Sequence, residues 1–286
     1  ERDERIEDEP DELDELSWID LGEHHLRGIE SPMRVWQARH RDIEEEHPPL
    51  RTPEGRGLHL PGTTSALIGR EREVETLREM VSGDRIVTIV GSGGSGKTRL
   101  AVGAARHALE DFDDVAWVDL AKSGVTDMIE PLVVAEMALH HGASDRRRRL
   151  VGHLRPRRAL LVFDNCEHVL SAVAELTEVL VEHCPALHVL ATSREPLELA
   201  GETLLRLGPL DVPERGSDLS RSAAGVLFAD RVKRARSGRT LVDSELTEAV
   251  EICRRLDGIP LALELAAGRA RSPRGRSQSG TPSRSS

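Results

Sequence analysis

A short run of β-branched and apolar residues that leads into a glycine-rich octet restricts the fold of this chain more than any other feature. Residues 87–90 read VTIV, and residues 91–98 read GSGGSGKT, which matches the pattern G-x-x-x-x-G-K-[ST]. Glycines let the main chain wrap closely around a phosphate group, so that backbone N–H groups can point at it. This octet, between a buried strand and a helix, predicts a phosphate-binding loop (P-loop).

The positions of the octet have distinct expected roles. Lys97 would reach the β- and γ-phosphates of a nucleotide, and the Thr98 hydroxyl would bind Mg²⁺. A helix that begins at Thr98 would add the favourable field of its N-terminus. A glycine-rich turn that fits the pattern by chance is the alternative. The candidate nucleotide-binding residues in this stretch are Gly91, Gly93, Gly94, Ser95, Gly96, Lys97, Thr98 and Arg99.

A second apolar run, residues 159–163, ends in the acid Asp164. A continuous apolar run predicts a strand that is buried on both faces, as in a parallel sheet. With further strands predicted at 115–120 and 187–192, the order of elements is that of a doubly wound α/β fold, which binds its ligand at the carboxyl ends of the strands. Asp164 is therefore predicted to hold Mg²⁺, directly or through water. The alternative is an acid that only caps the next helix.

Apolar residues at helical spacing predict helices between and after these strands. The predicted helices cover residues 70–81, 99–109, 126–140, 170–181, 221–236, 243–256 and 262–270. The four arginines at 146–149 are expected on a solvated helix face, rather than in contact with nucleic acid. Arg194 follows the predicted strand at 187–192, where it could contact a terminal phosphate.

Composition excludes several classes of function. The 286 residues carry a net charge of -11, which argues against binding of the whole chain to nucleic acid or to an anionic membrane. The cysteines Cys166, Cys184 and Cys253 are widely spaced and form no C-x-x-C pattern. They indicate neither a zinc site nor a disulfide framework, and they fit reduced thiols in the cytoplasm. No apolar run approaches 18 residues, so no membrane span is expected.

The outer parts of the chain differ from its centre. Residues 1–16 are almost wholly acidic and 271–286 are rich in Arg, Ser, Gly and Pro, so both are expected to be disordered. Residues 48–65 are rich in Pro, Gly and Thr without periodicity, which is typical of a linker. Between the acidic arm and the linker, residues 17–47 predict a small unit of short strands around a turn at 28–32.

Part of this small unit resembles a known enzyme family. Residues 21–28 read LGEHHLRG, which resembles the L-G-x-H-x-L-[RK]-G stretch at the end of class III adenylate/guanylate cyclase catalytic domains. The resemblance covers only residues 17–47, and the metal carboxylates and base-reading residues of such a domain would lie upstream of them. We therefore expect no cyclase activity from this chain.

Five motifs follow one another along the chain: IGRE at 68–71, the octet at 91–98, LVFDNCEH at 161–168, ATSREPL at 191–197 and EICRRLDGIPLA at 251–262. In this order they resemble the signal-transduction ATPases with numerous domains (STAND), the NB-ARC-like branch of the AAA+ ATPases. They are most similar to the ATPase segment of bacterial LuxR-type transcriptional regulators. The resemblance predicts a P-loop core over 66–215 and part of a helical lid over 216–270.

The resemblance also implies roles for individual residues. Ile68 and Gly69 would line an adenine pocket, and Pro260 would pack on the base from the lid. Arg194 would face the terminal phosphate of the nucleotide. The nucleotide would then hold two domains together, and ATP and ADP would favour different angles between them.

Hydrolysis is expected to be slow. Many AAA+ ATPases carry a Glu after the acid of the second motif, where it orients the attacking water, but here Asn165 follows Asp164 and cannot take a proton. Glu167 is a candidate substitute, although it also stands where the next helix would start. The candidate catalytic residues are therefore Lys97, Asp164, Arg194 and Glu167.

The expected function is an ATP- or ADP-binding signalling switch that uses Mg²⁺ and belongs to a transcriptional regulator. Its expected partners are the nucleotide and either other proteins or further copies of the chain, whereas DNA would be contacted only by domains outside it. The family continues after the Pro260 segment with further domains, so the chain is expected to be a fragment or a truncated reading frame. An active ATPase motor, a cyclase-linked enzyme and a nonfunctional remnant are the alternatives.

Overall fold

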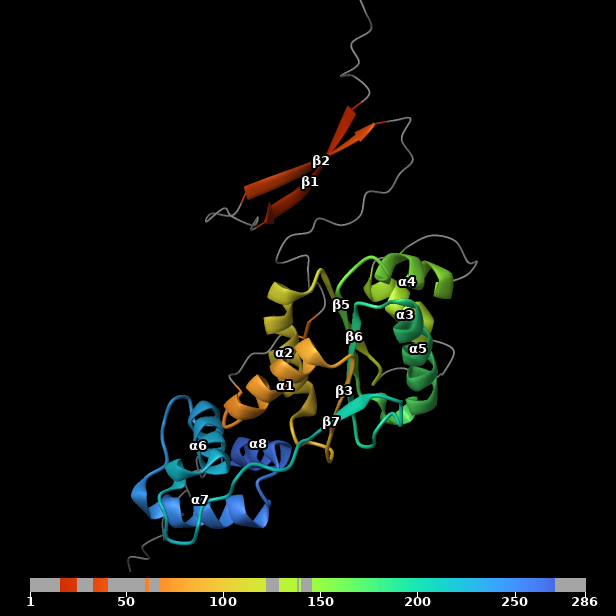
Figure 1. Ribbon diagram of the computed structural model, residues 1–286. Coiled ribbons are helices and arrows are strands. Elements are labelled where there is room, and N and C mark those ends of the chain that lie inside the picture. The colour runs from red at the N-terminus through yellow and green to blue at the C-terminus, as the bar shows by residue number, and fades with distance from the viewer. Residues whose placement is uncertain are drawn as a thin grey trace, which may run out of the picture.

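The computed structural model describes residues 16–24, 33–40, 60–61, 67–121, 129–137, 139 and 146–270. Five parallel strands form a sheet with helices on both faces, and three further helices follow it (Figure 1). This arrangement confirms the predicted α/β P-loop fold. The elements of the sheet and its flanking helices are α1 (Glu71–Gly83), β3 (Ile86–Val90), α2 (Lys97–Asp111), β4 (Asp114–Asp119), α3 (Ile129–Glu136), α4 (Arg146–Leu154), β5 (Ala159–Asp164), α5 (Leu170–His183), β6 (Leu187–Ser193) and β7 (Glu202–Arg206).

The order of strands across the sheet is β4-β5-β6-β3-β7, and every neighbouring pair is parallel. Strand β6 therefore lies between β3, which leads into the octet, and β5, which ends in Asp164. The carboxyl ends of parallel strands meet at one edge of a sheet. The loops that follow β3, β5 and β6 are thus brought together at that edge.

Strand β5 shows why its apolar run is continuous. Ala159, Leu161 and Phe163 belong to the core cluster that includes side chains of α3, α4 and α5. Leu160 and Val162 belong to the cluster on the opposite face, which includes side chains of α1 and α2. Figure 1 shows these two groups of helices on opposite faces of the sheet. Burial on both faces requires an apolar residue at every position of the strand.

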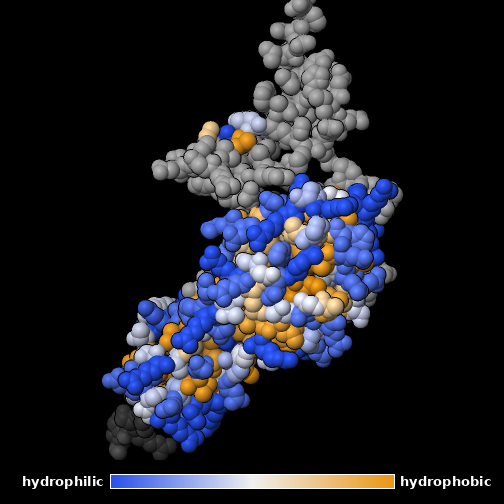
Figure 2. Space-filling view, in the orientation of Figure 1, coloured by the Kyte–Doolittle hydropathy of each residue, from blue (hydrophilic) through white to orange (hydrophobic). Residues whose placement is uncertain are grey.

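Three helices form a separate cluster after the sheet: α6 (Ala223–Ala235), α7 (Asp243–Arg255) and α8 (Pro260–Arg269). They share a core of their own that includes Phe228, Cys253 and Leu263. The Ser222 hydroxyl caps α6 by accepting a hydrogen bond from the Gly225 amide at 3.1 Å. The surface of both parts is mostly hydrophilic in the view of Figure 2, with apolar patches between the polar side chains.

The structure corrects the predicted elements at three places. Helix α2 begins at Lys97 rather than at Thr98 or residue 99, because Gly96 adopts a left-handed conformation (φ 99°) that ends the loop one residue earlier. Helix α8 begins at Pro260 rather than at residue 262, since proline suits the first turn of a helix. Strand β7 was not predicted, and it pairs with β3 at the edge of the sheet.

The N-terminal segment contains an antiparallel pair of strands, β1 (Leu16–His24) and β2 (Met33–His40), in which the pairing shifts register between Asp20 and Gly22. These strands agree with the short strands predicted there. The predicted turn at 28–32 and tail at 271–286 lie outside the described residues. So do the acidic arm except residue 16 and the linker except residues 60 and 61. None of the helices in the described part of the chain is both long and apolar enough to cross a membrane.

Candidate functional site

The octet forms a closed loop between β3 and α2. The Lys97 ammonium group lies in the curve of this loop and donates hydrogen bonds to the carbonyl oxygens of Gly91 at 2.8 Å and Ser92 at 3.1 Å. Lys97 is only 8% exposed, and this burial lowers the pKa of its amine. The Glu167 carboxylate acts on that pKa in the opposite direction. The cation therefore lies inside the curve of the loop, held by two of its carbonyl oxygens.

The other residues of the octet lie close to the neighbouring elements. Ser95 is buried, and a Cβ atom built on Gly91 would lie 2.6 Å from the carbonyl oxygen of Leu207, too close for any side chain. Gly94 has a positive φ of 77°, a conformation that glycine adopts at no steric cost. The loop therefore needs its glycines at these two positions for distinct reasons, close approach at Gly91 and backbone conformation at Gly94.

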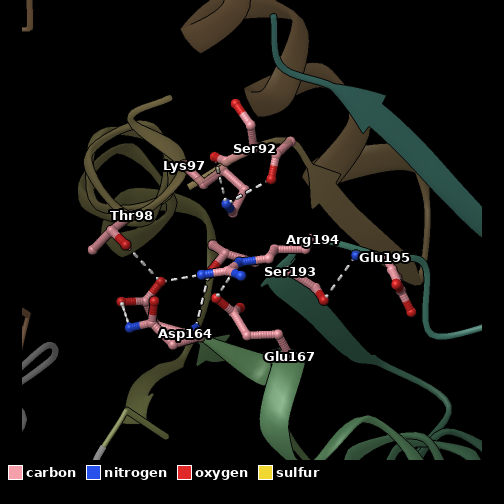
Figure 3. A network of polar contacts seen from close by, with 11 residues as sticks. Ser92, Lys97, Thr98, Asp164, Glu167, Ser193, Arg194 and Glu195 are labelled. Carbon is pink, nitrogen blue, oxygen red and sulfur yellow. Dashed lines mark hydrogen bonds and ion pairs between the residues drawn. The ribbon is translucent and has the colours of Figure 1, made fainter. Parts of the chain in front are cut away.

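Asp164 lies at the carboxyl end of β5 and faces the first turn of α2 (Figure 3). Its Oδ1 atom accepts hydrogen bonds from the hydroxyls of Thr98 at 2.9 Å and Thr192 at 2.5 Å, and its Oδ2 atom accepts one from Asn165 Nδ2 at 3.1 Å. Burial raises the pKa of Asp164, while the two hydroxyl donors counteract that rise. The strand-end acid and the P-loop helix, 66 residues apart in the chain, thus meet at one point.

The donors at this point fit a hard divalent cation. The Thr98 hydroxyl and the Asp164 carboxylate supply oxygen atoms, which are the ligands that Mg²⁺ takes, with its remaining positions filled by water and substrate phosphates. Among the residues that the structure describes, no group of three or more His, Cys, Asp or Glu side chains is arranged to hold a metal ion.

Thr192 is the site residue that sequence reasoning did not single out. Its side chain is fully buried, donates to Asp164 and accepts a hydrogen bond from the Asn165 amide at 3.0 Å. It therefore joins the end of β6 to the end of β5. The available signal was the pair of hydroxyl residues, Thr192 and Ser193, at the carboxyl end of a largely apolar strand.

Glu167 and Arg194 form an ion pair beside the loop. Glu167 lies in the 3-10 turn η3 (Cys166–His168), and Arg194 follows β6 directly. Arg194 Nε lies 3.3 Å from Glu167 Oε1, and the Glu167 side chain is 15% exposed compared with 62% for Arg194. A Cβ atom built on Gly93 would lie 3.6 Å from Nη2 of Arg194, so the guanidinium lies against the loop (Figure 3).

The lid helix α8 contacts the P-loop from the other side. The Leu261 amide donates a hydrogen bond to the Gly94 carbonyl oxygen at 3.2 Å, next to the half-buried Pro260. Arg99, in the first turn of α2, lies 2.9 Å from Glu264 of α8. The lid therefore meets both the loop and the helix that the loop opens.

The segment before α1 lies at the junction between the sheet and the lid. Ile68 packs against the core of the lid helices. Gly69 has a positive φ of 68°, and a Cβ atom there would lie 2.3 Å from Cβ of Ala223 at the start of α6. The structure therefore places Ile68 and Gly69 near the lid, whereas Lys97, Thr98, Asp164, Glu167 and Arg194 gather around the loop.

Two solved structures that are similar to this chain are of proteins named as ATPases. A STAND protein with a tetratricopeptide repeat sensor from Pyrococcus horikoshii is 17% identical, with a TM-score of 0.46, and the match covers 72% of this chain and 30% of that one. A Walker-type ATPase of Pyrococcus abyssi is 16% identical, with a TM-score of 0.47, and the match covers 71% of this chain and 67% of that one.

Curated mycobacterial proteins are more similar in sequence. A "Putative HTH-type transcriptional regulator" of Mycobacterium tuberculosis is 40% identical over 200 residues, which make up 68% of this chain and 21% of that protein. A second protein of Mycobacterium tuberculosis, uncharacterized, is 37% identical over 209 residues, 72% of this chain and 51% of that protein. The chain thus spans only part of the length of the curated relatives that it matches.

The match to a protein family covers the part of the chain that holds the P-loop, Asp164 and Arg194. Residues 70–202 match the NB-ARC domain. The site geometry, the relatives and this match agree with one another. This part of the chain is therefore an NB-ARC domain, a nucleotide-binding P-loop domain, and the chain is related in sequence to putative HTH-type transcriptional regulators.

Proposed function

We propose that this chain is an ATP/ADP-binding signalling switch, part of a transcriptional regulator, that uses Mg²⁺ and hydrolyses ATP slowly. The observation that carries the proposal is the meeting of Lys97, Thr98 and Asp164 at the carboxyl edge of the sheet. A lysine ammonium group and two oxygen ligands beside a glycine-rich loop are the groups that bind a nucleoside triphosphate with its Mg²⁺.

The roles of these residues follow from their positions. Lys97 donates to two loop carbonyls and would donate instead to oxygens of the β- and γ-phosphates. Thr98 and Asp164 would hold Mg²⁺, which neutralises phosphate charge when it is bound. Ile68, Gly69 and Pro260 are proposed to contact the base, because they lie where the lid meets the P-loop core.

Slow hydrolysis is proposed from the residues after Asp164. Asn165 cannot accept a proton, and its amide group already donates to Asp164. Glu167 is the carboxylate that could orient water at the loop, but its Oε1 atom is paired with Arg194. A carboxylate oxygen that is already paired with a guanidinium is less available to orient an attacking water, so turnover is expected to be slow.

The proposed switch depends on the contacts between the lid and the loop. Leu261 contacts Gly94, and Glu264 contacts Arg99, so α8 touches the chain on either side of Lys97. A nucleotide that binds the two lid arrangements with different affinity would shift the balance between them. Further domains of a regulator would then respond to the position of the lid.

Isothermal titration with Mg-ATP and Mg-ADP tests the proposal. Wild-type protein is expected to bind both nucleotides, and Lys97→Ala is expected to abolish binding, because it removes the cation inside the loop. Lys233→Ala is the matched control, since it removes an exposed lysine from the lid helix α6. Lack of binding by folded wild-type protein, or equal binding by Lys97→Ala, would overturn the proposal.

A faster ATPase motor is the competing proposal, and the position of Glu167 beside the loop favours it. A steady-state assay of phosphate release decides between the two. Rapid release that Glu167→Gln abolishes would support the motor, whereas release of less than about one phosphate per second would support the switch.

The resemblance of residues 17–47 to the end of a cyclase domain stays a hypothesis about ancestry.

A further inference from the structure

The ion pair between Glu167 and Arg194 joins a fixed residue to an exposed one. Glu167 lies in a short turn in which Cys166 is fully buried and the Val169 amide donates to the Cys166 carbonyl oxygen at 2.9 Å. The start of this turn is held to β6 by the hydrogen bond from the Asn165 amide to Thr192. Arg194, by contrast, is a long side chain with most of its surface in solvent. A change at this pair would therefore move the arginine and leave the carboxylate in place.

The arginine lies within reach of both the carboxylate and the loop. Its guanidinium pairs with Glu167 Oε1 and lies against Gly93 of the P-loop. The other carboxylate oxygen of Glu167 is buried and makes no hydrogen bond to the described residues. Guanidinium groups bind carboxylate and phosphate oxygens with the same planar geometry. Glu167 and a phosphate at the end of the loop would thus compete for one cation.

We propose that Glu167 is a positioning residue that competes with the terminal phosphate for Arg194 and thereby shifts the site toward diphosphate over triphosphate nucleotides. This inference rests on the proposed function. A diphosphate leaves the Glu167–Arg194 pair intact. A triphosphate must draw Arg194 away from Glu167, and its own negative charge then lies beside a carboxylate that has lost its partner. Both effects weaken the binding of triphosphate relative to diphosphate.

The test is the ratio of two equilibrium affinities, measured with Mg-ADP and with a non-hydrolysable ATP analogue with Mg²⁺. Glu167→Gln is expected to improve binding of the analogue relative to ADP by about fivefold, because it frees Arg194 and removes the facing charge. Glu195→Gln is the matched control. It removes the same charge from the residue next to Arg194, but Glu195 is exposed and its side chain points away from the pair (Figure 3).

A double-mutant cycle separates competition for Arg194 from simple charge repulsion. In an Arg194→Gln background, Glu167→Gln is expected to change the ratio by less than half as much as in the wild type, because no arginine is left to release. Glu167→Asp, which keeps the charge but withdraws it by one methylene, is expected to shift the ratio in the same direction. This conservative variant replaces Glu167→Gln in the affinity measurements if Glu167→Gln does not melt cooperatively.

The outcomes distinguish this inference from the proposed function. If wild-type protein binds neither nucleotide, the proposed function falls and this inference falls with it. If wild-type protein binds both, but Glu167→Gln leaves the ratio within about twofold of wild type, only the inference is overturned. An equal effect of Glu167→Gln in both backgrounds also overturns it, since Glu167 would then act without Arg194. Unchanged affinities with slower phosphate release would assign Glu167 to catalysis alone.

Discussion

The hydroxyl of Thr98 donates a hydrogen bond to the carboxylate of Asp164, so the first turn of the P-loop helix is tied directly to the end of β5. Strand β6 lies between β5 and the strand that leads into the loop, and its Thr192 donates to the same oxygen atom. Three elements of the sheet edge therefore converge on one carboxylate.

Asp164→Asn is expected to remove most of the Mg²⁺ dependence of nucleotide binding. An amide is a much poorer Mg²⁺ ligand than a carboxylate, and the loss in Mg²⁺-dependent affinity is expected to be about tenfold or more. The fold without nucleotide should be retained, since burial already disfavours the charged form of Asp164. Thermal shift with ATP, in Mg²⁺ or in EDTA, measures the effect. Asp119→Asn is the control, an exposed acid at the paired position of β4, and an equal loss in that variant would contradict the assignment.

Gly94→Ala is expected to destabilise the contact between the P-loop and the lid. Alanine disfavours the positive φ of 77° at this position, and its Cβ atom would lie 2.8 Å from Cβ of Leu261. A cost of about 1–3 kcal/mol in the free energy of unfolding is expected. Urea denaturation measures it, with Gly93→Ala as the control, because a Cβ atom there would meet only Nη2 of Arg194 at 3.6 Å. A larger cost at Gly93 than at Gly94 would contradict this structure of the loop.

Glu264→Gln is expected to loosen the lid. The Oε1 atom of Glu264 lies 2.9 Å from Nη1 of Arg99 in α2 and 3.0 Å from Nη2 of Arg231 in α6, so one carboxylate forms ion pairs with two arginines. Because all three side chains are partly exposed, a loss of about 1 kcal/mol is expected. Chemical denaturation in low salt measures it, and the loss should shrink as salt is added. Glu248→Gln, which removes an exposed acid from α7, should be neutral, and an equal effect there would indicate a general charge effect.

Stability should depend on pH through the pair between Arg236 and Glu245. Arg236 donates two hydrogen bonds to the carboxylate and, together with one from the Val242 amide, lowers the pKa of Glu245 from 4.5 to about 2. Because the folded-state pKa is the lower one, the stabilisation is fully present above pH 4.5 and is lost as the pH falls from there toward 2.

Thermal melting of wild type and Glu245→Gln between pH 7 and pH 3 checks this dependence. The wild type should melt at the higher temperature near neutral pH, and the difference should shrink as the pH falls below about 4.5. A difference that stays constant with pH would show that the pair does not act through the charge of Glu245.

Much of the sheet could be predicted because its strands are buried on both faces. Residues 159–163 are apolar at every position, and such a run has few alternatives to a central parallel strand. Strand β7 lacks this signal. It lies at the edge, where all but its last residue are half-buried, and its sequence ETLLR is neither continuous nor strictly alternating. It forms a strand because it pairs with β3, which lies more than a hundred residues earlier in the chain.

The candidate site also has a part that local sequence predicts and a part that it does not. The octet and the strand-end acid are local patterns, so Lys97 and Thr98 were predicted from the motif and Asp164 from the apolar run that it ends. The Glu167–Arg194 pair and the contact between Leu261 and Gly94 join segments that are distant in sequence. Their geometry depends on the order of strands across the sheet and on the position of the lid, which no local pattern encodes.

Two residues near the end of β6 make contacts at the site: Thr192, within the strand, donates to the Asp164 carboxylate, and Arg194, directly after the strand, pairs with Glu167. Because side chains alternate along a strand, a single residue inserted within β6 before Thr192 would turn both of them to the wrong face together. The hydrogen bond from Thr192 to Asp164 and the ion pair between Arg194 and Glu167 would then be lost together. Insertions and deletions in this strand should therefore be far less tolerated than substitutions at either residue.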